Sequence, residues 1–187
     1  MRADARRNRE RIVQAARELF AECGPEAQMD DLAARAGVGV GTVYRHFPTK
    51  DAVMGELLRQ RFAGFVETAR AALDEEGDPF EIFAGVLRAN AEAMADDAAT
   101  QRALASGDLL PRSHAQQEFE ELMRLSRELI ARAHQAGTLR PDFDVEDIPT
   151  MMCGVCATMA HHASFDWRRH LEMLLDGLRA RSPVAAG

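Results

Sequence analysis

Apolar residues recur three and four positions apart along nearly the whole chain, and no segment alternates apolar with polar residues over the length of a strand. In the first segment Ile12, Ala16 and Leu19 share one helix face, and Gly24 with Pro25 forms a helix stop. The sequence therefore predicts an all-α fold. The expected elements are a first helix that ends at residue 24, followed by helices over residues 29–37, 40–47, 49–75, 79–94, 98–106, 112–136, 145–163 and 166–181.

Composition narrows the class of protein. The 187 residues include 47 % hydrophobic residues and carry a formal net charge of −7, which is typical of a globular domain with a sizeable core. No apolar run approaches the roughly 18 to 20 residues that cross a bilayer, and the start MRADARRNRERIV lacks the apolar stretch of a secretory signal. We therefore expect a cytoplasmic protein without a membrane partner, in which the three cysteines are reduced thiols.

Charge is distributed unevenly along the chain. The first sixty residues hold ten basic and nine acidic side chains, whereas the remainder is strongly acidic. A relatively basic end on an acidic body suits a protein that approaches a polyanion with that end alone. The arginines Arg6, Arg7, Arg9 and Arg11 are interpreted as a basic arm before the first helix, placed either to contact phosphates or to form a solvated face.

The most informative stretch is MDDLAARAGVGVGTVYRHFPTKDAV, residues 29–53, which has the pattern of a helix-turn-helix motif. Ala33 is small where two helices must cross closely, and Gly37 supplies the sharp turn between them. Four apolar residues are spaced to hold both helices against the first helix, namely Leu32, Val38, Val43 and Phe47. The outer side of the second helix is then left for a partner.

That outer side carries the chemistry of duplex recognition. A recognition helix presents its first residues to base edges in the major groove, while its flanks contact phosphates. Arg45 can pair with guanine or with the backbone, Val40 can touch a thymine methyl group, and Thr42 offers a hydroxyl. Tyr44 can donate to a phosphate oxygen, with a core position for its ring as the alternative. Lys50 follows at the start of the next helix, where anions are favoured.

These residues resemble the TetR family of bacterial transcriptional regulators, through IVQAARELFAECG and DLAARAGVGVGTVYRHFPTKDAV, over about residues 8–60. More weakly, DWRRHLEMLLDGLRA resembles one actinobacterial-type branch of the family's regulatory domains. The resemblance implies an Ω-shaped homodimer of all-helical subunits, each with a three-helix DNA-binding head and a body of about six helices. The head would span residues 1–52, and the ligand-binding and dimerisation body residues 53–187.

By position, Thr42, Tyr44, His46 and Lys50 correspond to the DNA contacts of the family. The sequence departs from the family at two places, because Gln28 replaces the usual hydroxyl cap and Gly39-Val40 replaces the usual Ser-Lys or Ser-Arg. Arg45 is therefore expected to take more of the base reading. The predicted contacts to a double-stranded operator are Gln28, Gly39, Val40, Gly41, Thr42, Tyr44, Arg45, His46 and Lys50.

The last two helices carry apolar stripes. Trp167, Leu171, Leu174 and Leu178 are four, three and four residues apart, a spacing suited to helix packing. The spacing alone leaves open whether the packing partner lies within the subunit, and the resemblance favours a homodimer. The predicted dimer interface consists of Val155, Trp167, Leu171, Leu174 and Leu178.

The body is rich in methionine and phenylalanine, which suit an irregular apolar cavity as well as an ordinary core. We predict that the protein is a repressor of a palindromic operator and that its inducer is a small lipophilic or aromatic molecule. Binding of the inducer would release the repressor from the operator. Activation in place of repression stays open. The predicted ligand contacts are Phe62, Phe65, Phe83, Met94, Leu104, Phe119, Met123, Met152, Cys156 and Met159.

Two other classes of site are less consistent with the sequence. Cys153 and Cys156 lie one helical turn apart upstream of His161 and His162, but a second ligand pair at zinc-binding spacing is missing, so packing thiols are the simpler interpretation. The chain also lacks a nucleophile elbow, a phosphate loop and a Rossmann glycine run. We therefore expect no enzyme activity, no cofactor and no metal.

Overall fold

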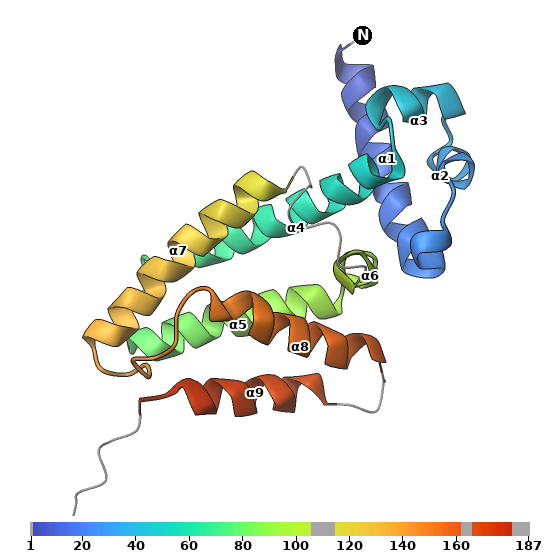
Figure 1. Ribbon diagram of the computed structural model, residues 1–187. Coiled ribbons are helices and arrows are strands. Elements are labelled where there is room, and N and C mark those ends of the chain that lie inside the picture. Colours follow the sequence, from blue (N-terminus) through green and yellow to red (C-terminus); the bar gives the residue numbers. More distant parts are fainter. Residues whose placement is uncertain (1, 106–114, 162–165, 181–187) are drawn as a thin grey trace, which may run out of the picture. The chain divides into compact units, whose positions relative to one another are not determined.

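The computed structural model describes residues 2–105, 115–161 and 166–180, and the regular structure within these ranges is helical, which confirms the all-α prediction (Figure 1). A short 3₁₀ turn, η1, spans Gly24–Glu26. The α-helices are α1 (Arg2–Cys23), α2 (Met29–Ala36), α3 (Val40–His46), α4 (Lys50–Ala72), α5 (Pro79–Ala95), α6 (Ala98–Ala105), α7 (Gln116–Gln135), α8 (Asp147–His161) and α9 (Trp167–Leu178). An isolated β-bridge joins Leu139, which follows α7, to Arg179 at the end of α9.

The chain divides into two compact units. Unit 1 comprises residues 1–63 and 96–119, and unit 2 comprises residues 64–95 and 120–187. Helices α4 and α7 each contribute one part to either unit. The structural division therefore differs from the sequence-based boundary after residue 52, since the first turns of α4 and all of α6 group with the N-terminal helices. The functional division at residue 52 stays a prediction.

Unit 1 is built on α1, which packs against α2 and α6, while α2 packs against α3. The apolar face expected for α1 is buried, with Ile12 and Ala16 fully covered and Phe20 only 2 % exposed. Burial of each of the larger apolar side chains contributes roughly 1.5 to 3 kcal/mol to the free energy of unfolding. The short helices α2 and α3 are therefore held by tertiary packing, because isolated helices of this length are unstable in water.

Unit 2 contains α5, α8 and α9, with α8 lying between α5 and α9 (Figure 1). Phe80 and Phe83 of α5, Val155 of α8 and Leu171 of α9 are buried among them. Helix α5 begins at a proline preceded by Asp78, whose carboxylate accepts hydrogen bonds from backbone N–H groups of the first turn. Within the described ranges, no helix has both the length and the apolarity that crossing a bilayer requires.

Candidate nucleic-acid interface

The turn between α2 and α3 is fixed by Gly37, which has φ +64° and ψ +39°. Its N–H donates to the Ala34 carbonyl and the Val38 N–H donates to the Ala33 carbonyl, both at 3.1 Å, a pattern that closes the end of α2. Arg11 of α1 donates from Nη2 to the Gly37 carbonyl at 3.0 Å. A Cβ at residue 37 would lie 2.6 Å from that Nη2 atom, a contact that a shift of the flexible Arg11 side chain would relieve, so glycine is required here for its left-handed backbone angles.

The inner face of α3 determines which side chains point outward. Val43 is fully buried and Phe47, which ends the helix, is 3 % exposed. Leu32 of α2 is 1 % exposed, and Val38 in the turn is half-buried. The four residues predicted to hold the two helices are thus on the packed side, and the opposite side of α3 is left to solvent.

The outward side of α3 is formed by the residues that the sequence placed there. Val40 is 39 % exposed and Tyr44 is 46 % exposed, so the alternative of a core position for the Tyr44 ring is wrong. Arg45, Gly39 and Gly41 are exposed as well, whereas Thr42 and His46 are half-exposed. Gln28 precedes α2, is exposed, and donates from its side-chain amide to the Glu26 carbonyl at 2.7 Å.

The start of α4 completes this surface. The Thr49 hydroxyl accepts a hydrogen bond from the Ala52 N–H at 3.1 Å and so caps the helix. Lys50 is the first residue of α4 and is half-buried. Its Nζ atom lies 5.9 Å from the centroid of the Phe20 ring on α1, which restrains the stem of the lysine against unit 1.

The prediction of a basic arm before the first helix is wrong, because α1 already begins at Arg2 and includes all four arginines. Arg9 donates from Nη1 to Glu56 of α4 at 2.9 Å, and its guanidinium lies 5.1 Å from the centroid of the Phe47 ring. Arg11 binds the Gly37 carbonyl as described. These two side chains are therefore positioning groups within unit 1, and sequence spacing could not show the partners that they reach.

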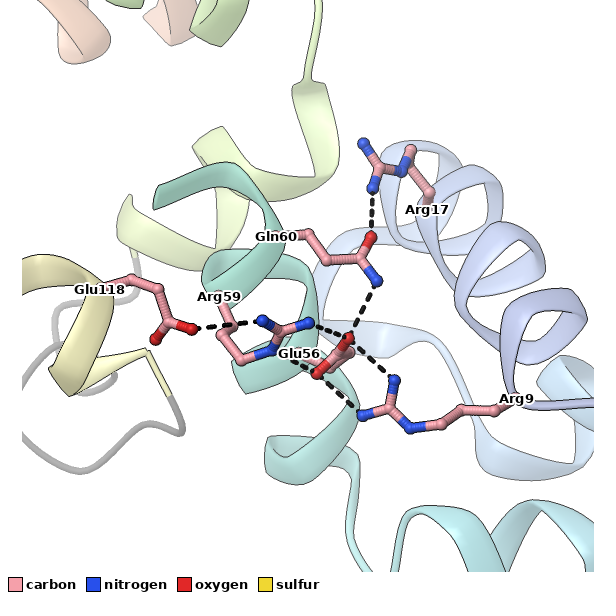
Figure 2. A network of polar contacts seen from close by, with 6 residues as sticks. All are labelled: Arg9, Arg17, Glu56, Arg59, Gln60 and Glu118. Atoms are coloured by element: carbon pink, nitrogen blue, oxygen red, sulfur yellow. Dashed lines mark hydrogen bonds and ion pairs between the residues drawn. The ribbon is translucent and has the colours of Figure 1, made fainter. Parts of the chain in front are cut away.

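Glu56 of α4 is the centre of a network of polar contacts in unit 1 (Figure 2). The residue is 3 % exposed, and its carboxylate accepts hydrogen bonds from Arg9, from Arg59 at 2.9 and 3.0 Å, and from Gln60 at 2.9 Å. Arg59 also donates to Glu118 of α7 at 3.2 Å. The network therefore links α1, α4 and the first turn of α7 inside unit 1.

The same network continues through Arg17 to the start of α6. Arg17 donates to Gln60 at 3.0 Å and lies 3.7 Å from the carboxylate of Asp97, which is 4 % exposed. Asp97 also accepts hydrogen bonds from Arg61 at 2.5 Å and from the Thr100 N–H and hydroxyl at 3.0 and 2.8 Å. Each of these buried carboxylates is thus paired and hydrogen-bonded, the condition under which burying a charge is tolerated.

These contacts determine the pKa values of the Glu56 and Asp97 carboxyl groups. Burial opposes ionisation of both carboxyl groups, but the hydrogen bonds to the Glu56 carboxylate from Arg9, Arg59 and Gln60 outweigh that effect and hold its pKa well below the ordinary value. The pKa of Asp97 is lowered in the same sense, because hydrogen bonds from Thr100 and Arg61 exceed the opposing effect of burial. Both groups are therefore charged at neutral pH; as anions, Glu56 holds α1 against α4 and Asp97 holds α4 against the start of α6.

The predicted ligand contacts fall into both units. Phe62 and Phe119 meet edge to face in unit 1, with ring centroids 5.6 Å apart. In unit 2, Phe65, Phe83 and Met94 are buried. Met123, Met152, Cys156 and Met159 of unit 2 are half-buried. The side chain of Leu104 lies outside the described residues. A pocket formed by the whole set stays a prediction.

Two of the predicted dimer contacts are corrected by the structure. Val155 is fully buried and Leu171 is 2 % exposed inside unit 2, so both face their own subunit and are not available to a partner. Trp167, Leu174 and Leu178 are half-exposed. Periodicity placed Leu171 on one stripe with Trp167, Leu174 and Leu178 of α9, but it could not separate the covered edge of that stripe from its open edge. Met173, which is 64 % exposed on α9, was missed because it lies off the stripe.

The two cysteines of α8 differ, and the interpretation of both as packing thiols is wrong for Cys153. Cys153 is exposed and Cys156 is half-buried, and burial, with a smaller effect of Cys153, raises the pKa of the Cys156 thiol to about 11. A thiol of this kind is a poor nucleophile and metal ligand at neutral pH. Among the residues that the structure describes, no group of three or more His, Cys, Asp or Glu side chains is placed to hold a metal ion. His162 lies outside those residues.

Comparison with known proteins identifies both parts of the chain. Residues 12–57 match the family described as bacterial regulatory proteins of the tetR family. Residues 78–180 match the family described as the C-terminal domain of SbtR-like transcriptional regulators. An HTH-type transcriptional regulator of Staphylococcus aureus is 28 % identical over 123 residues, and the match covers 65 % of this chain and 66 % of that relative.

Solved structures resemble nearly the whole chain. A TetR transcription regulatory protein from Mycobacterium vanbaalenii is 36 % identical, with a TM-score of 0.62 over 95 % of this chain and 98 % of that one. The TetR-family repressor FadR of Thermus thermophilus, solved with lauroyl-CoA, is 30 % identical, with a TM-score of 0.62 over 96 % and 99 % of the two chains. Both the N-terminal motif and the full-length helical fold are therefore shared with these proteins.

Proposed function

Because this chain belongs to the TetR family and is a DNA-binding transcriptional regulator, not an enzyme, we propose that it is a dimeric repressor released from a palindromic operator by a small apolar molecule. The observation that carries the proposal is the exposed side of α3, with Val40, Tyr44 and Arg45 held outward by the burial of Val43 and Phe47. A helix presented in this way fits the major groove.

The roles of the individual side chains follow from their chemistry. Arg45 is exposed and can form a bidentate pair with a guanine, while Val40 offers an apolar contact to a thymine methyl group. Tyr44 and His46 donate to phosphate oxygens, and Thr42 donates to a base or a phosphate. Lys50 supplies a cation at the start of α4, where the helix dipole adds to its attraction for phosphate. Gly39 and Gly41 allow the backbone to approach the duplex, and the exposed side chain of Gln28 can contact it.

The proposed dimer interface is the open side of α8 and α9. Between Ile148 and Ala160, α8 carries no charged residue, and its exposed positions include Thr150, Cys153 and Gly154. Helix α9 adds Met173, which is 64 % exposed, together with half-exposed Trp167, Leu174 and Leu178. An exposed helix face without charge, such as that of α8, is typical of the centre of a subunit interface. Two joined heads can then occupy two half-sites on one face of the duplex.

The proposed inducer is lipophilic or aromatic. Unit 2 combines buried phenylalanines with methionines that are only partly covered, a lining that adapts to apolar ligands. The Thermus relative, solved with lauroyl-CoA, carries a ligand with an apolar acyl chain. Release requires that the ligand favour a head arrangement that misfits the operator, with a differential affinity of about 1 to 3 kcal/mol or more.

Selection of bound fragments from the protein's own genome tests this function. We expect enrichment of inverted repeats with half-site centres about one or more helical turns apart, measured by sequencing the retained DNA. A transcription assay on such a fragment should show less transcript with the protein, and more again after addition of a compound that raises the melting temperature. Increased transcript without a ligand would establish activation instead. Retention of DNA without sequence preference would refute the proposal.

A further inference from the structure

One polar side chain interrupts the buried face of α5. Phe83, Leu87, Asn90 and Met94 follow one another at intervals of four, three and four residues and therefore share one side of the helix. Their exposed fractions are 1 %, 3 %, 7 % and 2 %. Asn90 thus occupies an apolar position in unit 2, although asparagine is rarely buried without partners.

The Asn90 amide is distinguished from the other buried polar groups by its hydrogen bonding. Its Oδ1 atom is buried and has no hydrogen-bond partner in the part of the chain that the structure describes. Glu56, Asp97 and Thr100 are equally buried, but each has hydrogen-bond partners. A buried acceptor without a partner destabilises the free protein, so its presence calls for a specific explanation.

On the buried face of α5, the residues one turn before and one turn after Asn90 are apolar, namely Leu87 and Met94. Phe83, on the same helix face, packs against Phe143 with ring centroids 6.0 Å apart. Helix α5 packs against α8. In such a medium a single hydrogen bond discriminates strongly between ligands, because the alternative is an unsatisfied polar group.

We propose that the Asn90 carbonyl oxygen is the polar anchor of the inducer site, and that the inducer is a mostly apolar molecule carrying one hydroxyl or N–H donor. The inference rests on the ligand-responsive part of the proposed function and narrows the ligand class from apolar molecules in general to alcohols, phenols and similar donors. Sequence reasoning missed Asn90 because a lone asparagine in a helix is usually exposed. Its position on the stripe of Phe83, Leu87 and Met94 was the available signal.

Matched ligands that differ only in the donor test this role. The probes are para-hexylphenol, its methyl ether para-hexylanisole, which accepts but does not donate, and hexylbenzene. With the wild-type protein, calorimetric titration should show about 10- to 100-fold tighter binding of the phenol than of the ether or the hydrocarbon, the effect of one hydrogen bond at a buried site. In Asn90→Leu this preference should vanish or reverse.

The variant also has a readout without any ligand. Removing the unsatisfied oxygen should raise the melting temperature of free Asn90→Leu by several degrees, roughly 2 to 8 °C. Thr100→Val is the matched control, because it removes an equally buried polar group that is hydrogen-bonded. It should lower the melting temperature and leave the preference for the phenol unchanged. Asn90→Ala serves as a second variant if leucine is too large, and it too should lose that preference.

Two results would overturn the inference: the same ligand preference in wild type and both Asn90 variants, or no binding of the phenol to the wild type. Neither result touches operator recognition, which is measured separately by retention of genomic fragments. Conversely, a wild type that prefers the phenol but retains DNA without sequence preference would leave Asn90 as a ligand anchor and refute the repressor function.

Discussion

Met173→Glu is expected to make the protein monomeric and to weaken operator binding by about 10² to 10⁴-fold. Met173 is 64 % exposed on α9, so a glutamate there costs the isolated subunit little. In a dimer formed through the open side of α8 and α9, the same charge would be buried against a partner without compensation. A monomer must bind the two half-sites in separate bimolecular events, which removes the gain from linkage. Analytical ultracentrifugation and operator titration measure the two effects.

The matched control is Ala131→Glu, which places the same charge on an exposed position of α7. This variant should sediment with the mass of the wild-type dimer and bind the operator with unchanged affinity. Leu174→Glu tests the half-exposed edge of the same interface and should also dissociate the dimer. If Met173→Glu and Leu174→Glu both sediment as dimers, the open side of α9 is not the interface.

Replacing both Arg9 and Arg59 with methionine is expected to lower the free energy of unfolding by about 3 kcal/mol at neutral pH. The double variant removes the two guanidinium groups that bind the buried Glu56 carboxylate and leaves Gln60 as its side-chain partner. The buried carboxylate that remains without its charged partners strongly destabilises the fold. Removal of the arginines themselves has a smaller effect, because both side chains are partly solvated. Chemical denaturation monitored by circular dichroism provides the measurement.

The corresponding control is Arg70→Met/Arg124→Met, which removes the two arginines bound to Glu121. Glu121 is more exposed than Glu56, with a side-chain exposure of 33 % against 4 %, so we expect a much smaller loss of stability than for the first pair. Adding Glu56→Leu to the first pair should restore much of the missing stability, because it removes the unpaired charge. A double variant as stable as the wild type would show that the network contributes nothing.

The pH dependence of stability follows from the same carboxylate. The pKa of Glu56 is lower in the folded protein than in the unfolded chain, so its ionised form stabilises the fold above the unfolded-state value of about 4.3. That contribution is lost as the pH falls from there toward the folded-state pKa. The acid side of the stability curve should therefore be less steep in Glu56→Gln than in the wild type.

Much of the fold could be predicted because local patterns decide it. Helical periodicity, the glycine turn at Gly37 and the stop at Gly24 each depend on residues close in sequence, and the structure has the corresponding elements. The outward side of α3 could be predicted for the same reason, since fixing Val43 and Phe47 inside leaves Tyr44 and Arg45 outside.

The rest depends on contacts between distant segments. Arg9 and Glu56 are 47 residues apart, and only the packing of α1 against α4 shows that the arginine serves as a tether and not as part of a free arm. Val155 and Leu171 belong to apolar stripes, but the stripe does not show which edge is covered within the subunit. Asn90 was overlooked because its type suggests exposure, while its position on α5 requires burial.

The most direct test of the DNA-binding surface compares wild type, Arg45→Ala and Lys50→Ala on a selected operator and on a scrambled duplex over a series of salt concentrations. Arg45→Ala should weaken operator binding by about 1 to 3 kcal/mol with little change on scrambled DNA, because a base-specific interaction is removed. Lys50→Ala should weaken both equally and reduce the salt slope by about one for each phosphate that the variant no longer neutralises. If both variants match the wild type on both duplexes, the outward side of α3 and the start of α4 are not the DNA-binding surface.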